Sequence, residues 1–225
     1  MAAQIRSSVV ADARWFTLGS SSPRRADLLA GAGLRFDVQV VDIDEAALID
    51  SSQRDPSVVV ERIAQAKFAA FPVDSDQPLL LTADTLVSCD DAIMGKPQSD
   101  QHLRDMLVHM SGQPVTVVTA VCVGSRGEAA KTEIVSTTVV LRELRADEIE
   151  RYVSTGAGRD KAGGLALQAQ AKPFISAVTG CWSNVLGLPV CAATALLDSV
   201  IALQPVAALE CEKQCSVELC GSYDG

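Results

Sequence analysis

Two long runs of β-branched residues constrain the fold of this chain more than any other feature. Residues 114–124 (PVTVVTAVCVG) and 132–144 (TEIVSTTVVLREL) have a short polar segment between them that contains SRGE. This pattern predicts an antiparallel β-hairpin. Elsewhere, strand patterns alternate with amphipathic helix patterns, which favours parallel pairing. Because the chain combines both, we predict an α/β fold with a mixed twisted sheet that is flanked by helices, and a cleft between two lobes.

The length of the chain agrees with one domain. It has 225 residues, of which 48% are hydrophobic, and it shows no internal repeat or low-complexity linker. We expect a single domain over residues 14–205, with weakly ordered termini at 1–13 and 206–225. We also expect a cytoplasmic protein, because no apolar run reaches the length that spans a bilayer and the first residues lack the apolar core of a secretory signal.

The net charge argues against one class of partners. The formal charge is −9, whereas a general nucleic-acid binder presents a basic face. We therefore expect neither nucleic acid nor a membrane among the partners. An anionic ligand would need a local cluster of basic residues, and the densest such cluster is LGSSSPRR at residues 18–25.

This cluster places positive charge where a helix normally disfavours it. Ser22 is a typical N-cap and Pro23 a typical first helical residue, so a helix should begin here. Arg24 and Arg25 then lie in the first turn, beside the positive end of the helix dipole. Together with free backbone N–H groups, two guanidinium groups would bind a phosphate. A capped helix with two solvated arginines is the alternative, and the residues alone leave both open.

Two acidic positions stand at expected ends of strands. Asp84 and Thr85 interrupt the apolar run LLLTADTLVS near its expected carboxyl end, where ligands collect in open α/β sheets. A carboxylate there can bind Mg²⁺ or accept a proton from water, and a strand-terminating turn is the alternative. Glu45, beyond the second expected strand (residues 34–44), could hold a divalent cation or belong to a solvated turn.

Two lysines complete the set of charged candidates. Lys67 lies in the helix expected from Pro56, and Lys96 precedes Pro97 in AIMGKP. Each alone is more typical of a surface lysine. Phosphate-binding cations and cation-binding carboxylates at successive element boundaries are, however, what a metal–nucleotide site requires.

The order of the motifs resembles that of the Maf family. The shared segments are LGSSSPRRADLL, the Asp-Glu after the second strand, ADTLV, GKP, MLVHMSG, DKAGG and SNVLGLP, and they extend over roughly residues 16–200. The resemblance implies an ITPase-like fold and a nucleoside triphosphate pyrophosphatase, a hydrolase that cleaves the α–β phosphate bond with a divalent cation, Mg²⁺ or Mn²⁺. It also implies a homodimer.

The resemblance further implies roles for individual residues. Arg24, Thr85 and Gln168 match the branch that acts on dTTP and UTP. The sequence departs from the usual residues of the family at Val115, at Leu165 and at Cys181-Trp182. These departures remove no charged group to which the resemblance gives a catalytic role. A non-catalytic nucleotide-binding regulator of septum formation is the alternative function. The implied triphosphate ligands are Ser20, Arg24, Arg25, Lys67 and Lys96, and the implied metal ligands are Glu45 and Asp84, with Asp84 as the proton acceptor.

Overall fold

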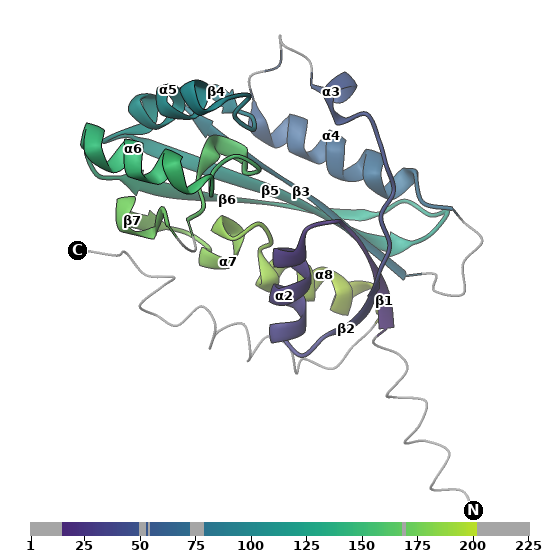
Figure 1. The fold of residues 1–225 in the computed structure, drawn as a ribbon. Coiled ribbons are helices and arrows are strands. Elements are labelled where there is room, and N and C mark those ends of the chain that lie inside the picture. Colours follow the sequence, from purple (N-terminus) through teal and green to yellow (C-terminus); the bar gives the residue numbers. More distant parts are fainter. Residues whose placement is uncertain (1–14, 50–52, 54, 73–78, 168–169, 202–225) are drawn as a thin grey trace, which may run out of the picture.

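The computed structural model describes residues 15–49, 53, 55–72, 79–167 and 170–201 (Figure 1). The termini that we expected to be weakly ordered, residues 1–13 and 206–225, lie outside this part of the chain, and so does Gln168. None of the helices in the described part is long and apolar enough to cross a membrane.

Within the described residues, seven strands form one mixed sheet, which confirms the predicted fold class. The strand order is β2-β1-β3-β5-β6-β7, with β4 paired to β3. Strand β1 is parallel to β2 and β3, whereas the remaining pairs are antiparallel. The strands are β1 (Trp15–Gly19), β2 (Arg35–Val38), β3 (Leu79–Cys89), β4 (Ala92–Met94), β5 (Pro114–Ser125), β6 (Lys131–Leu141) and β7 (Ile175–Thr179).

Local capping signals place several helix ends. Asp55 accepts a hydrogen bond from the Ser57 backbone at the start of α4, and Ser99 does so from His102 at the start of α5. The helices are α2 (Pro23–Gly31), α3 (Glu45–Leu48), α4 (Pro56–Ala69), α5 (Asp100–Met110), α6 (Ala146–Thr155), α7 (Trp182–Val185) and α8 (Val190–Ile201), with 3₁₀ turns η1 (Ala162–Gly164) and η2 (Lys172–Phe174).

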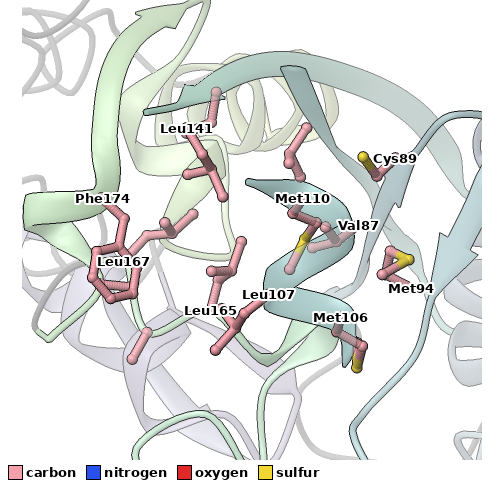
Figure 2. Packing of buried hydrophobic residues seen from close by; sticks show 14 of the residues in the cluster. Val87, Cys89, Met94, Met106, Leu107, Met110, Leu141, Leu165, Leu167 and Phe174 are labelled. Atoms are coloured by element: carbon pink, nitrogen blue, oxygen red, sulfur yellow. The ribbon is translucent and has the colours of Figure 1, made fainter. Parts of the chain in front are cut away.

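The two faces of the sheet are covered differently. On one face, α4 packs over β3 and β5 through a cluster that includes Val60, Ile63, Leu80 and Val118. On the other face, one apolar cluster lies with α2 and α8, and a second lies with α5 and α6 at the far end of the sheet (Figures 1 and 2). Between these two clusters β3 and β5 carry the paired residues Thr85 and Thr119, whose hydroxyl groups divide the apolar layer.

Three local predictions were wrong in ways that bear on the site. The strand expected over 34–44 ends at Val38, since β2 is an edge strand whose residues are mostly exposed. The short helix α3 was not predicted. Asp84 and Thr85 lie in the interior of β3, not near its carboxyl end. They pair with Ala120 and Thr119 of β5, so a strand-terminating turn at this position is excluded.

Candidate active site

The candidate site forms where β1 ends beside the middle of β3. Gly19, the last residue of β1, pairs in parallel with Thr82, and β3 continues past this point to Asp84. Asp84 therefore lies beside the carboxyl end of β1, which runs parallel to β3, although it is not at the end of its own strand. A Cβ atom on Gly19 would lie 2.7 Å from Thr82 Cγ2 and 2.8 Å from the Phe71 ring, so glycine is required here.

Lys67 joins the two acidic residues of the site. Its Nζ atom lies 2.6 Å from Asp84 Oδ1 and 2.8 Å from Glu45 Oε1. The Thr82 hydroxyl donates to the Ala64 carbonyl at 2.9 Å and fixes α4 against β3 one turn before the lysine. The Lys67 side chain is only 15% exposed, so it is not a surface lysine.

The same oxygen atoms would suit a divalent cation. Two carboxylates from different elements converge on one positive group, the Lys67 ammonium. Carboxylate oxygens are the ligands that Mg²⁺ and Mn²⁺ prefer, and Mg²⁺ commonly takes one or two of them together with substrate phosphates. The donor set of Glu45 and Asp84 therefore fits the cation that the resemblance implies.

Burial shapes the acidity of Asp84. Removal from water raises the pKa of its carboxyl group, and the nearby positive charges of Lys67 and Arg25 oppose that rise. A carboxylate with a raised pKa holds a proton more readily than an exposed aspartate. Asp84 is thus suited to accept a proton from a neighbouring water molecule.

Arg25 is buried, with 8% of its surface exposed, and it connects several segments. Its Nε donates to the Gly187 carbonyl at 2.8 Å, and its Nη1 donates to the Ala83 carbonyl at 2.8 Å and to Ser20 Oγ at 3.1 Å. Its Nη2 donates to Thr85 Oγ1 at 3.0 Å. Burial lowers the pKa of this guanidinium. All four acceptors are neutral, so none of these hydrogen bonds pairs the positive charge with a carboxylate.

The Thr85 hydroxyl belongs to the same network. It lies 2.9 Å from Thr119 Oγ1 of β5 and 3.2 Å from the Gly187 carbonyl, as well as accepting from Arg25. Neither Thr119 nor Gly187 was predicted from the sequence. The signal for Thr119 was a hydroxyl inside an apolar, β-branched strand, a residue type that needs a polar partner when buried.

The N-terminus of α2 is open to a ligand. Ser22 occupies the N-cap position, but its side chain makes no capping hydrogen bond and the first turn contains no acidic residue. Ser20 Oγ accepts from the Ser22 backbone N–H at 3.2 Å. The remaining first-turn N–H groups and the positive end of the dipole are features of an anion site.

Other predicted site residues lie toward the loop of residues 156–164. The charge of Arg24 contributes to the lowered pKa of Asp160, whose main cause is the hydrogen bond from Lys161. Lys96 is exposed, and the carbonyl of its neighbour Gly95 accepts from Gly163 N–H at 3.0 Å. This bond holds the segment of Lys96 against the glycine-containing loop.

The glycines of that loop serve packing within the chain. Gly163 and Gly164 both have φ near +67°, which glycine adopts without strain. A Cβ on Gly163 would lie 2.8 Å from Val87 Cγ1, and one on Gly164 would lie 2.3 Å from Leu103 Cδ1. Their close backbone approach is therefore to β3 and α5.

The structure thus brings together Ser20, Arg25, Glu45, Lys67, Asp84 and Thr85. For Arg24 and Lys96, no contact with this group appears among the described residues, and Gln168 lies outside them. The binding and catalytic roles of all these residues stay predictions.

Comparisons with known proteins show what this chain is similar to. The family model described as Maf-like protein matches residues 15–200. A dTTP/UTP pyrophosphatase of Desulforamulus reducens is 41% identical over 177 residues, which cover 77% of this chain and 90% of that protein. One of Geotalea uraniireducens is 38% identical over 194 residues, which cover 86% of this chain and 95% of that protein.

Proposed function

Since the chain belongs to the Maf family, we propose that it is a nucleoside triphosphate pyrophosphatase that hydrolyses dTTP and UTP. The products are the nucleoside monophosphate and pyrophosphate. The observation that carries this proposal is the position of Lys67 between Asp84 and Glu45, beside a buried Arg25 at an open helix N-terminus. The names of the two relatives support the choice of substrates.

The basic residues would hold the triphosphate. One N–H of Arg25 Nη2 has no acceptor among the described residues, and it can donate to a phosphate oxygen. The Ser20 hydroxyl and the first-turn N–H groups of α2 add neutral donors at the same place. Further positive charge would come from Lys67, Arg24 and Lys96. Stabilisation of the developing negative charge by such groups is the main contribution expected to the catalysis of phosphoryl transfer.

Asp84 would accept the proton of the attacking water. The water oxygen bonds to the α-phosphorus, its proton passes to the Asp84 carboxylate, and the bond to the bridging oxygen breaks so that pyrophosphate leaves. Glu45 and Asp84 would hold Mg²⁺ or Mn²⁺. A bound divalent cation supplies positive charge that offsets the charge of the triphosphate.

Arg24, Thr85 and Gln168 would select the pyrimidine nucleotides. Because the Thr85 hydroxyl is engaged with Arg25, Thr119 and Gly187, we infer that Thr85 acts by positioning these groups. A panel of triphosphates with pyrophosphate detection tests the selection. We expect dTTP and UTP to be turned over faster than purine triphosphates, and equal rates on both classes would reject the proposed selection. Non-standard nucleotides belong in the same panel.

The variant Asp84→Asn tests the mechanism. We expect it to lose pyrophosphate release from UTP, because the proton acceptor is removed, and to retain binding of a non-hydrolysable UTP analogue, because the basic residues that would hold the triphosphate remain. Asp27→Asn, on the exposed side of α2, is the matched control and should keep full turnover. Undiminished activity in Asp84→Asn would contradict the assignment. UTP binding without turnover in the unaltered protein would favour the alternative, a non-catalytic regulator.

A further inference from the structure

A second group of ligand-type side chains lies at the other end of β3. Strand β3 ends at Cys89, Asp90 and Asp91 form the turn to β4, and His109 belongs to the last turn of α5. The Cys89 sulfur, an Asp90 carboxylate oxygen and a His109 ring nitrogen all lie within 4.8 Å of one another. His109 Nε2 and Asp90 Oδ2 lie 3.6 Å apart.

Packed elements, rather than loose loops, hold this group together. Cys89 pairs with Ala92 across a two-residue turn in which Asp90 and Asp91 have φ of 49° and 60°, the geometry of a tight hairpin turn. The cluster that contains Cys89 also contains Met106 and Met110 of α5. Figure 2 shows Cys89 at the edge of this cluster, on the opposite side from Phe174.

The electrostatics at this end of the molecule favour a cation. The carboxyl end of a helix carries partial negative charge, and His109 lies in the last turn of α5. Asp90 and Asp91 add two exposed carboxylates. This concentration of negative charge attracts a divalent cation.

We propose that Cys89, Asp90 and His109 bind Zn²⁺, with water as the fourth ligand. Sulfur and nitrogen donors with one carboxylate are a set that Zn²⁺ prefers, whereas Mg²⁺ prefers oxygen donors. Typical Zn²⁺ bond lengths place tetrahedral ligand atoms about 3.3–3.6 Å apart. The histidine and aspartate atoms lie 3.6 Å apart and the three ligand atoms lie within 4.8 Å of one another, so they must approach by no more than about 1.5 Å to reach that spacing.

The neighbourhood of the thiol allows that movement. Met94, Met106 and Met110 belong to the same cluster (Figure 2), and methionine side chains adapt readily to small shifts. The Cys89 sulfur gives up only a weak contact with the Pro114 carbonyl, at 3.8 Å. Its thiol proton passes to water as the Zn²⁺–sulfur bond forms. The ion would connect the β3–β4 turn to the end of α5.

Cobalt in place of zinc gives the site a spectroscopic test in the full-length protein. A Co²⁺ ion bound to a thiolate shows a sulfur-to-metal charge-transfer band, which the carboxylates of the candidate active site cannot produce. In both Cys89→Ser and His109→Gln, we expect the intensity of the band per chain to fall by the contribution of one bound Co²⁺ ion. His102→Gln, an exposed histidine on the same helix, is the matched control.

Equilibrium dialysis with Zn²⁺ provides a second measurement, because Cys89→Ser alters a buried position. His109 is exposed, so His109→Gln should fold normally and bind one Zn²⁺ fewer per chain. Zn²⁺ should also raise the thermal midpoint of the unaltered protein more than that of His109→Gln. Equal Zn²⁺ content and an unchanged cobalt band in both variants would overturn the proposal. A band that persists unchanged in Cys89→Ser would assign it to other thiols of the chain and would also overturn it.

Discussion

Arg25 has two duties at the scale of a single residue. Its resemblance-based role is to bind phosphate, yet its hydrogen bonds also join the start of α2 to β3 and to the Gly187 carbonyl. The planar guanidinium makes these bonds in several directions at once, which the ammonium of lysine cannot do. A positive charge at this place is therefore not sufficient, and the shape of the group matters as well.

Arg25→Lys should lower both stability and turnover. The substitution keeps the charge but leaves buried acceptors unpaired, so we expect a loss of about 2–4 kcal/mol in the free energy of unfolding. Denaturant titration measures this loss, and pyrophosphate release from UTP measures the activity. Arg24→Lys is the control, because Arg24 is only half-buried. If both variants unfold at the same denaturant concentration as the unaltered protein, Arg25 has no structural duty.

At the scale of elements, local signals predicted what local chemistry decides. Helix α5 follows from Ser99 as its cap, and α6 ends at Gly156, which has φ of 69°. The hairpin of β5 and β6 follows from two β-branched runs. Asp84 was misplaced because an 11-residue strand tolerates a carboxylate in its interior only through Lys67 and Arg25, and neither partner is close to it in sequence.

Helix α6 depends on one carboxylate at its first turn. Glu148 accepts from Arg142 Nη2 at 2.8 Å and Nη1 at 3.0 Å, and from the Arg145 backbone at 3.1 Å. The Arg142 hydrogen bonds chiefly lower the pKa of Glu148, to about 2. Because the folded-state pKa lies below the ordinary value, the ionised group stabilises the fold above that value. This stabilisation is lost as the pH falls towards the folded-state pKa.

The variant Glu148→Gln should therefore have a pH-dependent effect. We expect its thermal midpoint to lie below that of the unaltered protein at neutral pH, and the difference to shrink as the pH falls from the ordinary pKa of 4.5 towards 2. Glu143→Gln, an exposed neighbour, should show no such trend. A difference that stays constant over this pH range would mean that the charge of Glu148 does not stabilise α6.

At the scale of the whole molecule, the site exists because distant segments meet. Ser20 follows β1, Glu45 begins α3, Lys67 lies in α4 and Asp84 lies in β3. Residue types and boundaries could be predicted from local patterns, but their convergence depends on the parallel register of β1 and β3. The combination of cations and carboxylates at element boundaries suggested a shared site, and the order of motifs shared with the Maf family indicated it more specifically. The Thr119 and Gly187 contacts could not be foreseen, since both depend on how the strands and the end of α7 pack.

This convergence predicts a global effect of ligands. A cation with a non-hydrolysable UTP analogue would bind across four segments and only in the folded chain, so it should stabilise the entire molecule. At about 100 times the dissociation constant, the expected gain is about 2.7 kcal/mol. Thermal unfolding with the analogue, with and without Mg²⁺, measures it.

Glu45→Gln should need more Mg²⁺ for the same rise in midpoint, because a cation ligand is lost, whereas Glu143→Gln should match the unaltered protein. Removal of Mg²⁺ with a chelator should abolish turnover, and a midpoint that rises equally in Glu45→Gln at every Mg²⁺ concentration would exclude Glu45 as a cation ligand.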